Sequence, residues 1–196
     1  AVATLRPNEG RFGGAVAVEE GTENIVNTDF ASWYTTRCDV EIYEDGSAKV
    51  TNDNYGIPRF TSPSISVQAG QVITGSVYVL ESSRDPARAR LSFYGNNGYI
   101  GNSVSIYGAG RHEITVTVPE GVTSVSFWIH PDRIESTEWI TIKQPQVEQK
   151  PFATSFVDGT RAAGRLSYPV NFNMDEGTIH VWFYFNGTTA RNTLYG

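Results

Sequence analysis

The stretch Val125–His130 holds the side chains best suited to contacting a ligand. Successive side chains of a β-strand point to opposite faces, so the odd-numbered and even-numbered residues separate. The odd positions are all apolar and suit the buried face of a sheet, whereas the even positions are Ser126, Trp128 and His130. An aromatic ring flanked by hydrogen-bonding groups suits a flat, polar, ring-shaped ligand. The strand therefore predicts a sheet with one buried face and one binding face.

Two further segments alternate in the same way. Residues 72–80 would place Tyr78 on the outward face, and residues 87–94 would place Arg90 and Tyr94 there. These groups differ from the Glu and Thr side chains that residues 113–117 would present to solvent. Asn97, in the Gly/Asn loop 95–98, could extend the face. We therefore expect one outward face that carries the candidate ligand-contacting residues Trp128, His130, Tyr78, Tyr94, Arg90 and Asn97.

The elements that must position these residues are short strands bounded by turn residues. Asp45 and Gly46 separate two such runs and predict a tight hairpin, because this pair accepts the positive φ of the turn. No segment shows a helical period. The predicted strands are 40–43, 47–50, 65–67, 72–80, 87–94, 104–107, 114–118, 125–130 and 139–142. This spacing predicts an all-β fold, an antiparallel β-sandwich of the jelly-roll type.

The composition fits a globular protein and narrows the partners. Of the 196 residues, 39% are hydrophobic and 18% are charged, which excludes a disordered chain. The formal net charge of −6 argues against nucleic acid or an anionic membrane as the partner. No apolar run is long enough to cross a membrane. The single Cys38 cannot form an internal disulfide, and we expect it to be a small buried side chain.

The chain divides into three parts. Residues 1–23 form a lead-in with room for one short strand, residues 24–158 hold the dense run of strands, and residues 159–196 combine a linker with an incomplete β segment or arm. Within the last part, residues 177–185 alternate and predict a strand. So few strands cannot form a stable second core. We expect both ends to belong to a longer or processed chain.

Several phrases of the sequence resemble carbohydrate-binding-module-like jelly-roll domains. Residues 24–33, including Phe30 and Trp33, resemble the opening pattern of these modules. Residues 67–78 and 116–128 resemble later strands of the family. Residues 145–156 resemble the closing pattern of such modules in phage tail and fibre proteins, and residues 10–22 resemble the connector that precedes them in phage structural proteins. Residues 177–185 look like the first strands of a concanavalin-like lectin domain.

The resemblance implies a module that binds a polysaccharide or other glycan and catalyses no reaction. Sugar rings stack on aromatic rings, and Arg, His and Asn side chains bond sugar hydroxyls, so the predicted face is chemically apt. The resemblance also implies a host-surface polysaccharide as the ligand, a virion or extracellular location, and other virion proteins or further copies of the chain as neighbours. Phe30 and Trp33 are expected in the core. Fold alone does not give function, since such modules can also be scaffolds.

The resemblance further implies a structural calcium ion near the first and last strands. Asn27, Asp29 and Glu148 are the candidate ligands that match in position. Calcium takes about six to eight oxygen ligands, and these three side chains do not form a diagnostic loop. Ordinary turn and cap hydrogen bonds are the alternative role for them.

Three functions stay open from the sequence. The first is a non-catalytic carbohydrate-binding module of a phage virion protein. The second is a structural or oligomerisation module whose aromatic face is a contact between subunits, because interfaces are also rich in aromatic residues. The third is an accessory domain of a secreted glycosidase. Asp132, Glu135 and Glu138 could supply the carboxylate pair of a glycoside hydrolase, but acidic clusters in loops are typical of solvated surface, and we expect no enzyme.

Overall fold

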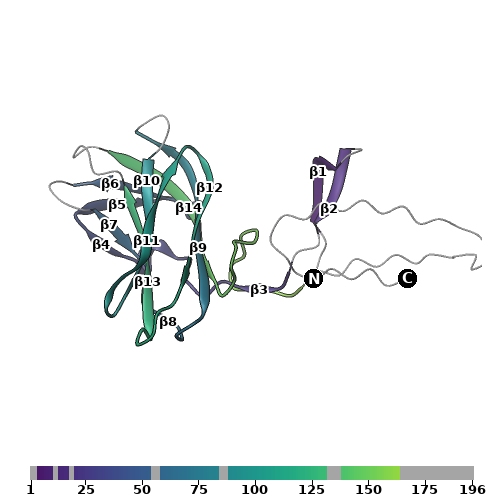
Figure 1. The fold of residues 1–196 in the computed structure, drawn as a ribbon. Coiled ribbons are helices and arrows are strands. Elements are labelled where there is room, and N and C mark those ends of the chain that lie inside the picture. The colour runs from purple at the N-terminus through teal and green to yellow at the C-terminus, as the bar shows by residue number, and fades with distance from the viewer. Residues whose placement is uncertain are drawn as a thin grey trace, which may run out of the picture.

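The structure is a computed structural model that describes residues 4–10, 13–17, 20–53, 58–83, 88–131 and 138–163, the first two ranges as backbone alone. In this part of the chain the regular structure is β-strand apart from one short 3₁₀ turn, η1 (Phe30–Ser32). Figure 1 shows two sheets packed face to face, which confirms the predicted antiparallel β-sandwich. None of the described residues form a helix long and apolar enough to span a membrane.

Two antiparallel sheets make up the sandwich. The six-stranded sheet has the order β11 (Gly98–Tyr107), β10 (Arg88–Gly95), β13 (Ser124–Pro131), β7 (Arg59–Thr61) and β4 (Tyr34–Thr36), and β8 (Ile65–Ser66) also pairs with β13. The five-stranded sheet has the order β12 (Gly110–Thr117), β9 (Val72–Ser82), β14 (Trp139–Glu148), β6 (Ala48–Asn52) and β5 (Cys38–Ile42). Two small pairs lie outside these sheets, β1 (Thr4–Gly10) with β2 (Gly13–Ala17) and β3 (Thr22–Glu23) with β15 (Thr160–Arg161).

Each of the nine predicted strands overlaps a strand of the two sheets, which together hold eleven. The predicted hairpin joins β5 to β6, and Gly46 has a φ of 78° at its turn. The short strands β4 and β7 were not predicted, and β11 and β14 are longer than expected. Cys38 is buried as expected, and burial raises the pKa of its thiol. The strand predicted at residues 177–185 lies outside the described residues.

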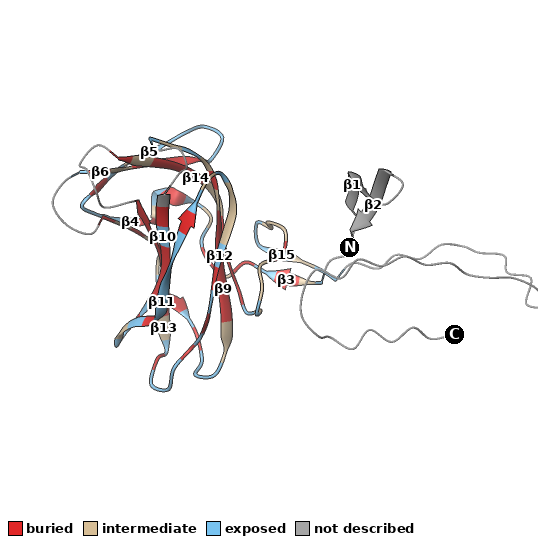
Figure 2. Ribbon diagram, turned by 45° about the horizontal axis from the view of Figure 1, so that its top comes forward, coloured by how far each residue is buried: buried red, intermediate tan, exposed pale blue. Residues whose placement is uncertain are grey.

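Phe93 and Phe127 of the six-stranded sheet pack against β9 of the five-stranded sheet at Gly75. Both rings are fully buried, with centroids 5.2 Å apart. Opposite them lies Gly75, where an added Cβ atom would stand 2.7 Å from the Phe127 ring and 2.8 Å from the Phe93 ring. No side chain fits in that space without displacing a ring. The other residues expected to face inward are also buried: Val77, Val79, Ala89, Leu91, Val125 and Ile129. Figure 2 shows these buried stretches along the strands of both sheets.

A second aromatic group extends the core toward η1. Asp29 caps this turn by accepting a hydrogen bond from the Ala31 amide at 2.9 Å. The turn places Phe30 and Trp33 against Phe60 of β7, with ring centroids 5.4 Å and 5.0 Å from the Phe60 ring. Phe30 and Trp33 are therefore core residues, as the family resemblance implies.

Residues 149–158, which we call the strap, cover part of the outer face of the five-stranded sheet. Thr74 points away from the core, because its neighbours along β9 face inward, yet it is fully buried. Its hydroxyl donates a hydrogen bond to the Lys150 carbonyl at 2.7 Å. Gln146, on the same outer face, accepts a hydrogen bond from the Val157 amide at 2.8 Å. The strap thus closes a polar layer over this sheet.

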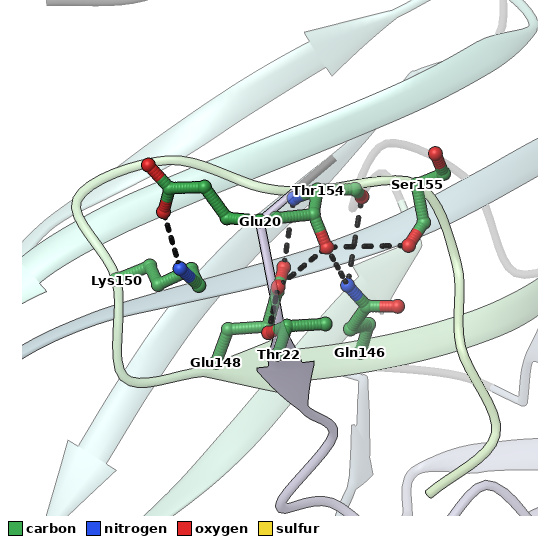
Figure 3. Close-up of polar contacts among 7 residues, drawn as sticks. All are labelled: Glu20, Thr22, Gln146, Glu148, Lys150, Thr154 and Ser155. Carbon is green, nitrogen blue, oxygen red and sulfur yellow. Dashed lines mark hydrogen bonds and ion pairs between the residues drawn. The ribbon is translucent and has the colours of Figure 1, made fainter. Parts of the chain in front are cut away.

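Glu148, at the end of β14, fastens both the strap and β3 to the sheet (Figure 3). Its buried carboxylate accepts hydrogen bonds from the Thr22 hydroxyl, from the Thr154 hydroxyl at 2.7 Å and from the Thr154 amide at 2.9 Å. Burial alone would raise the pKa of Glu148, but the hydrogen bonds from Thr22, Thr154 and Gln146 outweigh it and lower that pKa. The carboxylate is therefore stabilised in its charged form.

The segments by which the chain enters and leaves the sandwich, β3 and β15, lie side by side. β3 pairs with β15 in antiparallel register, and the Asn24 amide donates a hydrogen bond to the Gly159 carbonyl at 2.8 Å. The Asn24 side chain also donates to the carbonyls of Pro145 and Val157, at 3.0 Å and 3.1 Å. One asparagine thus links the first segment, the last sheet strand and the strap.

The Gly75 contact predicts a large penalty for any side chain at this position. We expect Gly75→Ala to lower the free energy of unfolding by about 1–3 kcal/mol, because the new methyl group overpacks the aromatic core. Urea denaturation of the two proteins measures this difference. In a Phe127→Leu background the same substitution should cost less, because the smaller side chain leaves room for the methyl group. Equal costs in the two backgrounds would contradict the assigned clash.

The Glu148 contacts predict a pH-dependent loss. Glu148→Gln should lower the free energy of unfolding by roughly 1–3 kcal/mol at neutral pH, because the strap loses a charged acceptor. Since the folded pKa of Glu148 lies below its usual value of 4.5, the wild-type advantage should be complete above pH 4.5 and shrink as pH falls further. Denaturation from neutral to acid pH measures the trend. The exposed Glu120→Gln is the control, and a gap that is constant with pH would exclude the proposed charge effect.

Candidate ligand-binding face

The outer face of the six-stranded sheet carries a packed group of rings around Trp128. Tyr94 stacks on Trp128 with ring centroids 4.3 Å apart and an interplanar angle of 9°. Tyr99 meets the same indole edge-on at 5.5 Å, and the Arg59 guanidinium lies over it at 4.7 Å. We call Arg59, Tyr94, Tyr99 and Trp128 the aromatic cluster. Its members come from four neighbouring strands, β7, β10, β11 and β13.

The prediction that Trp128 and His130 are exposed is wrong. Their exposed fractions are 7% and 5%, although both point away from the core. The physical reason is that the large side chains of the adjacent strands fold over them. The indole N–H of Trp128 is buried without a hydrogen-bond partner among the described residues. The rings that reach solvent are instead those of Tyr94 and Tyr99, with exposed fractions of 38% and 53%.

His130 is fixed between two neighbours of the face. Its Nδ1–H donates to the Pro58 carbonyl at 3.0 Å, since a carbonyl can only accept, and this leaves Nε2 to accept from the Ser92 hydroxyl at 2.7 Å. Burial, together with the nearby charges of Arg59 and Arg90, lowers the pKa of His130 to about 4 despite the opposing hydrogen bond to Pro58. His130 is therefore neutral at physiological pH. Because both ring nitrogens form hydrogen bonds within the protein, we infer that His130 holds neighbouring residues of the face in place and does not contact a ligand.

Tyr78 does not belong to this face, which corrects the expected grouping. β9 lies in the five-stranded sheet, so Tyr78 points outward on the opposite side of the sandwich. There the Lys143 ammonium lies 5.4 Å from its ring centroid. Alternation within a strand was predicted correctly, but alternation does not tell which of the two sheets a strand joins.

Arg90 and Asn97 lie where the sequence suggested. Arg90 is exposed on β10, paired across the sheet with His130, and four residues from Tyr94 on the same face. Asn97 is exposed in the turn between β10 and β11, beyond the register pair of Tyr94 with Tyr99. The structure thus brings Trp128, His130, Tyr94 and Arg90 together, with Asn97 at the rim.

Two members of the face, Tyr99 and Arg59, were missed from the sequence. Tyr99 is paired with Tyr94, and Arg59 and Tyr34 come from the short strands β7 and β4. Tyr34 is paired with Thr61, which is itself paired with Trp128, so the face continues across these strands. The signal that could have found Tyr99 is its place one residue after the Gly/Asn turn, where a hairpin partner of Tyr94 must lie.

The three candidate calcium ligands are occupied by hydrogen bonds within the protein. Asn27 accepts from the Asp29 amide at 2.9 Å, Asp29 caps η1, and both carboxylate oxygens of Glu148 hold the strap and β3. No group of three or more His, Cys, Asp or Glu side chains suited to a metal ion occurs within the described ranges. Turn, cap and strap hydrogen bonds thus account for these three side chains, and the calcium ion stays a prediction from the family resemblance.

The face has the properties of a stacking platform. The exposed rings of Tyr94 and Tyr99 meet at 83°, with centroids 5.3 Å apart, and form an apolar corner. Ser126 lies directly across the sheet from Tyr94, and Arg90 stands further along the same strand. Apolar ring faces beside hydroxyl and guanidinium groups match the alternating apolar and hydroxylated surfaces of a sugar.

Comparisons with known proteins bear on the fold. No protein-family model matches the chain, and no curated protein sequence matches it. Among solved structures it is similar to an arabinose-bound α-L-arabinofuranosidase, MgGH51, with 16% identity and a TM-score of 0.51 over 72% of this chain and 28% of that one. It is also similar to a CBM4 structure, with 15% identity and a TM-score of 0.45 over 67% of this chain and 95% of that one.

A third similar structure is the enzymatically active domain of tailspike protein 4 from bacteriophage CBA120. Its identity is 14% and its TM-score 0.45, over 63% of this chain and 21% of that chain. This chain thus spans only about a fifth of the tailspike domain and little more than a quarter of the arabinofuranosidase. Several further similar structures are carbohydrate-binding modules. At these identities the similarity concerns the β-sandwich fold alone, and the phage setting stays a prediction.

Proposed function

We propose that this protein is a non-catalytic carbohydrate-binding module that holds a polysaccharide against the outer face of its six-stranded sheet. The observation that carries the proposal is the exposed ring of Tyr94, which stacks on the buried Trp128 and is bordered by Tyr99. A sugar ring that stacks on the free side of Tyr94 meets a platform whose orientation is already fixed. Little conformational freedom is lost on binding, which favours affinity.

The arrangement supports binding rather than catalysis. Glycoside hydrolysis uses a pair of carboxyl groups that flank the bond to be cleaved. The described strands of the six-stranded sheet carry no Asp or Glu, and the buried His130 uses both ring nitrogens within the protein. The groups at the surface of the face include tyrosine, serine and arginine side chains, which can bind and orient a sugar.

The finer part of the proposal is that the ligand is a host-surface polysaccharide and that the module acts in a virion or outside a cell. Residues 10–22 and 145–156 support this setting by their resemblance to phage structural proteins. Other virion proteins or further copies of the chain are then its neighbours. Sequencing the complete gene tests the setting: a catalytic glycosidase domain in the same reading frame would favour an accessory module of a secreted enzyme instead.

The proposed function predicts that Tyr94 contributes strongly to glycan affinity. We expect Tyr94→Ala to weaken binding to a polysaccharide ligand roughly ten-fold or more, equivalent to about 1.4 kcal/mol, because the stacking surface is lost. Affinity electrophoresis against a polysaccharide panel, followed by calorimetry on the polymer that is bound, measures the effect.

Tyr43→Ala is the matched control for this prediction. Tyr43 is 38% exposed, as Tyr94 is, but follows β5 at the edge of the five-stranded sheet. Both variants should unfold cooperatively from a native fold, Tyr94→Ala at a somewhat lower denaturant concentration because it uncovers Trp128, and only Tyr94→Ala should lose affinity. Undiminished binding by Tyr94→Ala, or equal losses in both variants, would remove the aromatic cluster from the binding site.

A second candidate function is a contact between subunits. Tyr34, Tyr99 and Tyr107 are exposed by 65%, 53% and 58%, and all three lie on strands of the six-stranded sheet. Tyrosines are also enriched in protein interfaces. Light scattering over a dilution series distinguishes the two: a trimer or larger oligomer that dissociates on Tyr34→Ser would favour this candidate, and a monomer at all concentrations would exclude it.

A further inference from the structure

Charge is distributed unevenly between the two sheets of the sandwich. The strands of the five-stranded sheet carry five carboxylates, Asp39, Glu41, Glu81, Glu113 and Glu148. The described strands of the six-stranded sheet carry arginines and no carboxylate. In a chain with a formal net charge of −6, the described strands that carry the aromatic cluster thus have no acidic side chain.

Two arginines of this face converge on His130 from opposite sides. Arg90 is paired with His130 across β10 and β13, while Arg59 precedes Phe60, the partner of Ile129 on β7. Both guanidinium groups act on His130, since their charges contribute to the low pKa of its ring. The neutral His130 ring therefore lies between Arg59 and Arg90 and neutralises the charge of neither.

Neither arginine has a carboxylate partner within the described part of the chain. Arg59 lies over the Trp128 ring, and its buried Nε–H has no acceptor among the described residues. Arg90 is exposed to solvent beside the Tyr94 platform. Guanidinium groups bind carboxylate, sulfate and phosphate oxygens in a bidentate manner, so unpaired arginines beside a stacking surface provide a site for an anionic group.

We propose that the polysaccharide bound by this face is acidic, with carboxylate or sulfate groups of the glycan held by Arg90 and Arg59 while its sugar rings stack on Tyr94 and Tyr99. This inference rests on the proposed carbohydrate-binding function and specifies its ligand class. Arg90 and Tyr94 are four residues apart on one strand, about 13 Å along β10. A ligand that reaches both residues is therefore an oligosaccharide segment rather than a single sugar.

Charge complementarity favours an acidic glycan over the other polyanion, nucleic acid. Nucleic-acid binding depends on many basic groups that neutralise successive phosphates. The arginines of this face whose side chains are described, Arg59 and Arg90, lie among aromatic and hydroxyl groups in a protein of net negative charge. Two cations suit a glycan in which charged groups recur at intervals along the chain. Single-stranded DNA is accordingly included in the test as the competing outcome.

The test compares acidic polymers with their own neutralised forms. Polygalacturonate and alginate are paired with the same polymers after chemical reduction of their carboxyl groups, a sulfated galactan is paired with its desulfated form, and xylan and mannan serve as neutral ligands. Binding of the full chain is measured by affinity electrophoresis and calorimetry at low and high sodium chloride. We expect binding to at least one acidic polymer, at least a ten-fold loss on its neutralisation, and weakening by salt.

Variants of Arg90 test whether the preference for acidic polymers arises at this face. Arg90→Gln should weaken binding to the acidic polymer about ten-fold, and Arg90→Lys should weaken it less, because lysine keeps the charge but loses the bidentate geometry. Lys143→Gln is the control, since it removes one positive charge from the five-stranded sheet and changes the net charge equally. Tyr94→Ala should reduce binding to every polymer that is bound.

The outcomes separate this inference from the function on which it rests. Binding to neutral polymers as tightly as to acidic ones, or equal losses in Arg90→Gln and Lys143→Gln, would overturn the acidic ligand and leave the carbohydrate-binding function standing. DNA binding as tight as that of the best acidic polymer would overturn the assignment to a glycan. Failure to bind any polysaccharide would overturn both proposals.

Discussion

The contact of Phe93 and Phe127 with the backbone at Gly75 sets the spacing of the two sheets. The rings occupy the space that any side chain at Gly75 would need, so the sheets can pack at this distance only with glycine at position 75. Because side chains alternate along a strand, fixing these two rings also fixes the outward direction of their neighbours Tyr94 and Trp128. The geometry of the outer face is therefore a consequence of how the core is packed.

The outer face owes its order to contacts among its own side chains. Trp128 is covered by Tyr94 and Tyr99, and His130 is held by Pro58 and Ser92. Burying these groups makes the exposed parts of the face stiffer than an open row of tyrosines would be. It also keeps His130 uncharged, so that it adds no repulsion between Arg59 and Arg90 at neutral pH. A rigid apolar corner and two arginines that have no carboxylate partner among the described residues thus lie within one surface.

The sequence predicted the fold better than the site, for a physical reason. Alternation is local, so the inward set that includes Leu91 and Ile129 could be read directly, as could the hairpin at Gly46. The order of strands in a sheet depends on pairings between residues far apart in the chain. The side chains that cover Trp128, and the sheet to which Tyr78 belongs, were therefore not accessible from alternation. The short strands β4 and β7 carry too few residues for any periodic signal.

The side-by-side entry and exit of the chain has a mechanical consequence. In an antiparallel pair the hydrogen bonds run perpendicular to the strands. Tension that pulls β3 and β15 apart from their shared outer end therefore loads the bonds between them one after another instead of all at once. The next contacts in line are those of Asn24 and of the strap at Glu148. Under tension, these polar contacts would break first, and the hydrophobic sandwich would unfold last.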